Sequence, residues 1–126
     1  MAAALSLPEA TVIASDIDPV AVDVARANAD LNGVGQRIEC LEATGLDHPR
    51  FHAAGPFDLI FVNILKGPLI ALAPDLGRAA SPGGNVVLSG ILNPQADEVS
   101  SVYSRAGFHE AYRDVIGDWT TLTMVR

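Results

Sequence analysis

Short apolar runs alternate with helical patterns along this chain, and the alternation restricts the folds that the chain can adopt. The runs lie at residues 12–16, 37–41, 57–62 and 85–89. Between them, apolar residues recur at three- and four-residue steps, which is the spacing of one helix face. Successive parallel strands need such helical crossovers, which pack back onto the sheet. We therefore predict a doubly wound α/β fold with helices on both faces of a sheet.

The C-terminal part of the chain predicts a different strand arrangement. Residues 108–115 and 119–125 flank Gly117-Asp118, a turn signal that is typical of an antiparallel hairpin. A doubly wound sheet that ends in such a hairpin differs from a simple dinucleotide-binding half, and it favours a methyltransferase. The run at 57–62 is nearly all apolar, so we expect it to be buried on both faces.

Capping and breaking residues mark the expected helix boundaries. Asp18-Pro19 predicts a helix start, Asn32-Gly33 predicts its end, and Pro82-Gly83-Gly84 predicts a break in the chain. Proline inside a helix disrupts its hydrogen bonding, so Pro74 can kink the second helix. The helices are expected at residues 19–31, 67–80 and 94–106.

Two polar residues, Asp16 and Asn63, stand where apolar runs end. In open α/β sheets ligands bind outside the carboxyl ends of the strands, so we expect both residues at one edge of the sheet. A carboxylate can accept hydrogen bonds from both hydroxyls of a ribose. An amide can accept a hydrogen bond from an amine or donate one to a carboxylate. The alternatives are that Asp16 only caps and solubilises, and that Asn63 satisfies a loop backbone.

Charge and cysteine content exclude several classes of protein. The net charge is −7 with 8 lysines and arginines, which argues against nucleic acid as a direct partner. No apolar run approaches the ~18 residues of a membrane span. Cys40 is the only cysteine, so no internal disulfide can form and a cytoplasmic location is expected. A length of 126 residues suits a single domain, spanning 1–126.

No metal site is predicted. His48 and His52 are four residues apart beside Asp47. However, Pro49 makes a helix across them doubtful, and no third ligand stands near. His109 falls within the expected hairpin, where we interpret it as a residue of the strand surface.

Several motifs occur in an order that resembles a known family. The chain contains, in this order, VIASDIDPVAV, NGV, NILKGPL, SPGG, LSGIL and AGF. The pieces DIDP and PGG are shared by many methyltransferases, whereas NILKGPL followed by LSGIL is much more specific. From Val12 to the C-terminus, the chain resembles the catalytic domain of the ribosomal protein L-eleven methyltransferase family, whose members are class I S-adenosylmethionine-dependent enzymes.

The resemblance implies a function and roles for the two candidate residues. Asp16 would bind the cofactor ribose, and Asn63 would lie in the active site in contact with cofactor and substrate amine. Family members methylate lysine ε-amines and an N-terminal α-amine of a ribosomal protein of the large subunit. The full-length enzyme is expected to be a monomer. Lys66 stands where relatives often carry a small residue, so no role is assigned to it.

The chain also departs from the family pattern. The family places a first strand, a glycine-rich loop and a substrate-recognition domain ahead of the residues matched here. Residues 1–9 look like the tail of the helix that follows the loop. In the family the first strand lies between the strands that end at Asp16 and Asn63, so we expect unpaired inner edges, weak cofactor binding and no efficient catalysis by this chain alone.

Two other functions remain open at the level of sequence. A nicotinamide-dependent oxidoreductase fragment also suits an acidic residue after a strand, although its glycine fingerprint is equally absent. A truncated non-catalytic domain is the second alternative. A cofactor-binding assay on a full-length parent would separate the first of these from a methyltransferase, and the reading frame upstream of Met1 bears on the second.

Overall fold

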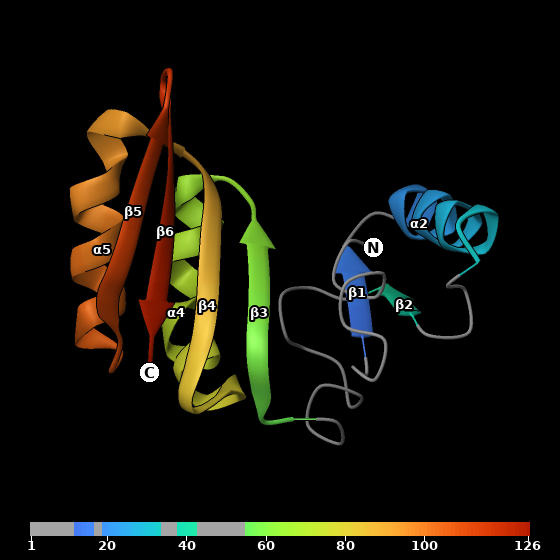
Figure 1. Cartoon of the computed structure of the whole chain (residues 1–126), viewed down its shortest axis with the longest axis horizontal. Coiled ribbons are helices and arrows are strands. Elements are labelled where there is room, and N and C mark those ends of the chain that lie inside the picture. The colour runs from blue at the N-terminus through green and yellow to red at the C-terminus, as the bar shows by residue number, and fades with distance from the viewer. Residues whose placement is uncertain (1–11, 17–18, 34–37, 43–54) are drawn as a thin grey trace. The chain divides into compact units, whose positions relative to one another are not determined.

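The computed structural model describes residues 12–16, 19–33, 38–42 and 55–126, and it divides the chain into two compact units at residues 48 and 49. In the first unit, β1 (Val12–Asp16) and β2 (Ile38–Glu42) form a parallel two-stranded sheet (Figure 1). The helix α2 (Pro19–Leu31) connects them, as the sequence predicted, with proline as its first residue. Its inner face buries Val22 and Ala29.

The second unit holds a four-stranded sheet in the order β3-β4-β6-β5. The strands are β3 (Phe57–Asn63), β4 (Ala80–Leu92), β5 (His109–Ile116) and β6 (Trp119–Val125). β3 and β4 are parallel, whereas β6 runs antiparallel to both β4 and β5. The parallel strands and the terminal hairpin are therefore confirmed, and His109 is exposed on β5 as expected.

The helices of this unit cover one face of its sheet. These are α4 (Lys66–Ala79), the short 3-10 helix η1 (Asn93–Gln95) and α5 (Ala96–Arg105), and Figure 1 shows α4 and α5 on the same side of the strands. Alternate side chains of β4 and β6 pack against these helices. The core between the two layers consists of fully buried residues, among them Leu69, Leu76, Leu88, Val99, Leu122 and Met124.

A buried tyrosine joins the two helices. The Tyr103 hydroxyl donates a hydrogen bond of 2.7 Å to the backbone oxygen of Leu69, which links α5 to α4. Burial raises the pKa of the Tyr103 phenol, because the charged phenolate is disfavoured away from water. Close to it, a Cβ added to Gly77 would lie 2.8 Å from the backbone oxygen of Ala106, so glycine allows the end of α5 to approach α4.

The expectation that the run at 57–62 is buried on both faces is wrong. Phe61 is 65% exposed and Leu59 is 39% exposed, while Val62 is buried. The physical reason is that β3 is the end strand of its sheet and that α4 and α5 cover only one face. The prediction of helices on both faces of one sheet concerns the two units together and stays a prediction.

β4 is longer than the expected strand at 85–89. It begins before the glycine pair, and its register with β3 jumps from Phe57↔Ala80 to Leu59↔Asn85. The irregular stretch is held by Ser81, whose hydroxyl lies 2.7 Å from Asp58 Oδ1 and donates to it. The Pro-Gly-Gly segment is thus a distortion within the strand, because Ala80 still reaches the start of β3.

The residues that the structure describes bear on two functional classes. No group of three or more histidine, cysteine, aspartate or glutamate side chains gathers there as a metal site. None of the described helices is long and apolar enough to cross a membrane. His48 and His52 lie outside the described residues.

Candidate functional site

Asn63 lies at the carboxyl end of two parallel strands. It is the last residue of β3 and pairs with Ser89 of β4. Its side chain is exposed, and no hydrogen-bond partner for the amide occurs in the described part of the chain. Within the described residues, the alternative that Asn63 satisfies a loop backbone has no hydrogen bond behind it.

The Asn63 side chain can lie where it does because residue 90 of the neighbouring strand is a glycine. Gly90 follows Ser89 on β4 and has φ +77, in the left-handed region that favours glycine. A Cβ on Gly90 would overlap Asn63 Oδ1 and would stand 3.6 Å from Asn63 Cγ. The Asn63 side chain thus lies directly over the β4 backbone, and its position depends on the missing side chain of its neighbour.

The segment after Asn63 turns sharply into α4. Ile64 and Leu65 are exposed, and the backbone amide of Leu69 donates a 2.9 Å hydrogen bond to the oxygen of Leu65. Pro68 falls in the first turn, where the absence of an N–H costs no helical hydrogen bond. The GP pair of NILKGPL is therefore a helix start, and it places the segment beside the end of β3.

Lys66, which the sequence left without a role, has a structural contact. Its Nζ lies 3.0 Å from Glu98 Oε2, so an ion pair connects the start of α4 to α5. Both side chains are partly exposed, and such pairs contribute little to stability. The Lys66 ammonium is therefore engaged with Glu98 of α5.

Sequence reasoning missed Asn93, which directly follows the last residue of β4. Its Nδ2 donates to the Gly117 oxygen at 2.9 Å, and its Oδ1 accepts from Thr120 Oγ1 at 2.7 Å. Its backbone amide also donates to the Asp118 oxygen at 3.0 Å. Three hydrogen bonds therefore pin the tip of the terminal hairpin to the end of β4. The only signal in the sequence was an asparagine before a proline, which is common in turns.

Asp16 is the last residue of β1, at the carboxyl end of the parallel pair in the first unit. Its backbone position there agrees with the prediction. In register beside it stands Glu42, the last residue of β2, which sequence reasoning passed over. The two units are described separately, so the expectation that Asp16 and Asn63 share one edge stays a prediction.

Comparison with known proteins agrees with this geometry. The family model described as Ribosomal protein L11 methyltransferase (PrmA) matches residues 1–126. The chain is 47% identical over 115 residues to a ribosomal protein L11 methyltransferase of Chelativorans sp. (strain BNC1), covering 91% of this chain and 40% of that protein. For the enzyme of the same name from Brucella suis, identity is 49% over 96 residues, covering 76% of this chain and 34% of that protein.

Solved structures show the same fold. The ribosomal protein L11 methylase of Lactobacillus delbrueckii subsp. bulgaricus superposes with a TM-score of 0.83 at 30% identity, covering 92% of this chain and 57% of that one. An RNA methyltransferase from Salinibacter ruber, solved with S-adenosyl-L-homocysteine, gives a TM-score of 0.67 at 19% identity over 90% of this chain and 63% of that one, and shows the fold alone.

The chain spans about 40% of the length of the first curated relative that it matches. One family model covers the chain from end to end, including Asn63 at the end of β3 and the glycine on the neighbouring strand. The Rossmann-like α/β methyltransferase fold with a terminal hairpin, predicted from the sequence, is confirmed by structural neighbours. The chain belongs to the ribosomal protein L11 methyltransferase family.

Proposed function

We propose that this chain is part of an S-adenosylmethionine-dependent protein methyltransferase that modifies amino groups of ribosomal protein L11. The acceptors would be lysine side chains and the N-terminal amine. The observation that carries the proposal is the exposed Asn63 amide at the carboxyl edge of β3, without a hydrogen-bond partner in the described residues. Family membership supplies the reaction class.

Asn63 is proposed to contact both the substrate and the cofactor. Its Oδ1 can accept a hydrogen bond from the incoming amine, and its Nδ2 can donate one to the cofactor carboxylate. Gly90 would act as a positioning residue, because it leaves the space that the Asn63 amide occupies. An exposed amide held over a strand backbone fits such a dual role better than a flexible loop residue does.

Asp16 is proposed to bind the ribose hydroxyls of S-adenosylmethionine. It ends a parallel strand, where a carboxylate can accept two charge-assisted hydrogen bonds. When bound, the cofactor supplies an electrophilic methyl group on a sulfonium.

The residues of this chain would prepare the acceptor. A free lysine amine has a pKa near ~10.4 and is charged at neutral pH, so it must lose its proton before it can act as a nucleophile. An environment poor in water lowers that pKa. A hydrogen bond to Asn63 Oδ1 would then orient the neutral amine, and such positioning can supply much of the rate acceleration.

The chain alone is proposed to be a poor catalyst that binds S-adenosylmethionine weakly. The proposal keeps the expectation drawn from the resemblance, in which a first strand and a glycine-rich loop precede the matched residues. Differential scanning calorimetry of the isolated chain tests this statement. We expect no rise of its unfolding temperature at micromolar cofactor, and a clear rise would contradict the proposal.

The protein encoded by the complete reading frame around this sequence provides the test of function. We expect it to transfer the labelled methyl group of S-adenosylmethionine to purified ribosomal protein L11. A nicotinamide dinucleotide should give a binding signal no greater than that of a buffer control. The family match favours methyl transfer over the oxidoreductase alternative. Tight dinucleotide binding with no methyl incorporation would reverse that preference, and neither activity would favour the non-catalytic domain.

A further inference from the structure

A groove runs between α4 and α5 at the end of the sheet opposite Asn63. It encloses about 540 Å³. The groove lies near the C-terminal end of α4, and Ala80, which follows that helix, pairs with Phe57 at the start of β3. Asn63 ends the same strand, so the strand length separates the groove from the candidate site. Its side-chain lining includes Ile70, Ala73, Arg78, Val102, Arg105 and Arg126.

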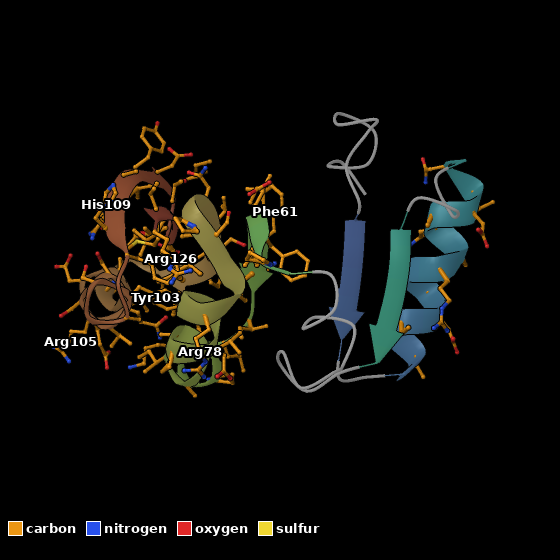
Figure 2. The ribbon with its side chains drawn as sticks, turned by 90° about the horizontal axis from the view of Figure 1, so that it is seen from below. Phe61, Arg78, Tyr103, Arg105, His109 and Arg126 are labelled. Atoms are coloured by element: carbon orange, nitrogen blue, oxygen red, sulfur yellow. The ribbon has the colours of Figure 1, made fainter. Side chains whose placement is uncertain are left out.

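Three arginines line this groove in a chain of net charge −7 that has only 8 lysines and arginines. They come from different segments: Arg78 from the last turn of α4, Arg105 from the last turn of α5, and Arg126 from the residue after β6. Figure 2 shows the three labelled side chains in the part of the molecule formed by these elements. The fold therefore gathers positive charge that the sequence disperses.

Two of these three arginines have no acidic side-chain partner in the described residues. Arg105 Nη2 donates to the Ser101 hydroxyl at 3.1 Å, and the Arg126 guanidinium donates to the Ala80 backbone oxygen. Neither bond is to a carboxylate. Only Arg78 has an acidic partner in the described residues, Asp75, and that carboxylate is itself half exposed.

Part of the groove lining is apolar. Ala73 and Gly77 are buried, and Ile70 and Val102 are half-buried. The close approach of Gly77 to the Ala106 backbone brings the two helices together beneath it. An apolar side chain from a partner would cover Ile70 and Val102, while acidic groups at its sides would reach the arginines.

Helix electrostatics alone do not account for this arrangement. Cations in a last turn interact favourably with the helix dipole, which explains Arg78 and Arg105 one at a time. It does not explain why Arg126 arrives from the end of β6 or why apolar residues line the same groove. The combination matches helix-in-groove recognition, in which an apolar stripe supplies contact area and charge complementarity selects the partner.

We propose that the groove between α4 and α5 binds an acidic amphipathic segment of another protein. Nucleic acid fits less well, because the lining has no aromatic side chain on which bases could stack and the net charge of the chain is −7. The proposal goes beyond methyl transfer. A partner seated here would leave the edge at Asn63 accessible.

Fluorescence anisotropy with the protein from the complete reading frame tests the proposal. The probe is a labelled helical peptide with leucines at three- and four-residue spacing and glutamates on both sides of them. We expect saturable binding that Arg105→Glu weakens by about tenfold or more, as for a lost charge-assisted pair turned repulsive. Arg26→Glu, a matched charge reversal on the exposed face of α2, should leave binding unchanged.

A charge swap makes the test specific. The double variant Arg78→Glu/Arg105→Glu should bind the same peptide with lysines in place of glutamates, and Arg105→Gln should show an intermediate loss for the acidic peptide. The proposal is overturned if the acidic peptide does not bind, if Arg105→Glu and Arg26→Glu weaken it equally, or if a short single-stranded RNA competes for the groove. Unchanged far-ultraviolet circular dichroism would confirm that the variants are folded.

Discussion

The side chain of Asn63 occupies the space that a Cβ on Gly90 would fill, so the last residue of β3 is positioned by a glycine on β4. We predict that Gly90→Ala displaces the Asn63 amide and strongly lowers methyl transfer. It should also destabilise the protein by about 1–3 kcal/mol, because alanine is strained at φ +77. Turnover assays and urea unfolding would measure the two effects.

Gly83→Ala is the matched control for that variant. Gly83 has the same φ of +77 on the same strand, but a Cβ there would meet nothing within 4 Å. The backbone strain should therefore be similar, while methyl transfer at a temperature where both variants are folded should stay near that of the wild type. Equal activity of the two variants would show that Gly90 does not position Asn63.

The hydrogen bond from Tyr103 to the Leu69 oxygen predicts a pH-dependent stability. Tyr103→Phe should lower the free energy of unfolding by about 1–2 kcal/mol, since a buried carbonyl loses its donor. Tyr112→Phe, on an exposed strand position, should change it by no more than ~0.5 kcal/mol. Urea denaturation of both variants at neutral pH measures these differences.

The raised pKa of Tyr103 gives the direction of the pH effect. The unfolded phenol ionises near pH ~10, whereas the buried one keeps its proton to a higher pH. The contribution of Tyr103 to stability is therefore complete below pH ~10. It is lost as the pH rises from there toward the pKa of the buried phenol. Tyr103→Phe should remove this part of the alkaline loss. An identical alkaline dependence in the wild type and the variant would contradict the assignment.

β3 has an exposed apolar side chain on an end strand, which predicts self-association of the isolated chain. Phe61 is 65% exposed, and end strands with such residues pair readily with other chains. Sedimentation velocity should show concentration-dependent association that Phe61→Lys reduces. Tyr112→Lys, at a similarly exposed aromatic residue of β5 at the other end of the sheet, should reduce it less. A monomer at all concentrations would exclude this edge as an association surface.

Much of the fold could be predicted because its signals are local. Asp18-Pro19 and Asn32-Gly33 bracket α2 within one residue, and the turn at Gly117-Asp118 separates β5 from β6. The exposure of Phe61 could not be predicted, because an apolar run shows that a strand forms and not which of its faces is covered.

The site was predictable only in part for the same reason. Asn63 follows a strand in sequence, so its position at a strand end could be read directly. The dependence on Gly90 could not, because it arises from the pairing of β3 with β4 across residues distant in sequence. Arg78, Arg105 and Arg126 are likewise isolated along the chain, and only the packing of α4 and α5 on a sheet that contains β6 brings them to one groove.

Asp16 is expected to affect binding of the cofactor more than the chemical step. In the protein from the complete reading frame, Asp16→Ala should weaken S-adenosylmethionine binding by about 1.5–3 kcal/mol, the loss of hydrogen bonds to a charged group. Turnover at saturating cofactor should change little. Isothermal titration calorimetry measures the affinity, with Asp23→Ala on the exposed surface of α2 as the control. Wild-type affinity in Asp16→Ala would remove this residue from the site.

The steady-state kinetics of Asn63→Ala test the central claim most directly. With S-adenosylmethionine and ribosomal protein L11 as substrates, we predict that kcat falls by about 10²-fold, because the amine loses the group that orients it. Cofactor affinity should fall by less than about tenfold. Asn85→Ala, at an exposed asparagine toward the other end of β4, should keep wild-type kinetics. If Asn63→Ala instead keeps the wild-type kcat, this edge of the sheet is not where methyl transfer takes place.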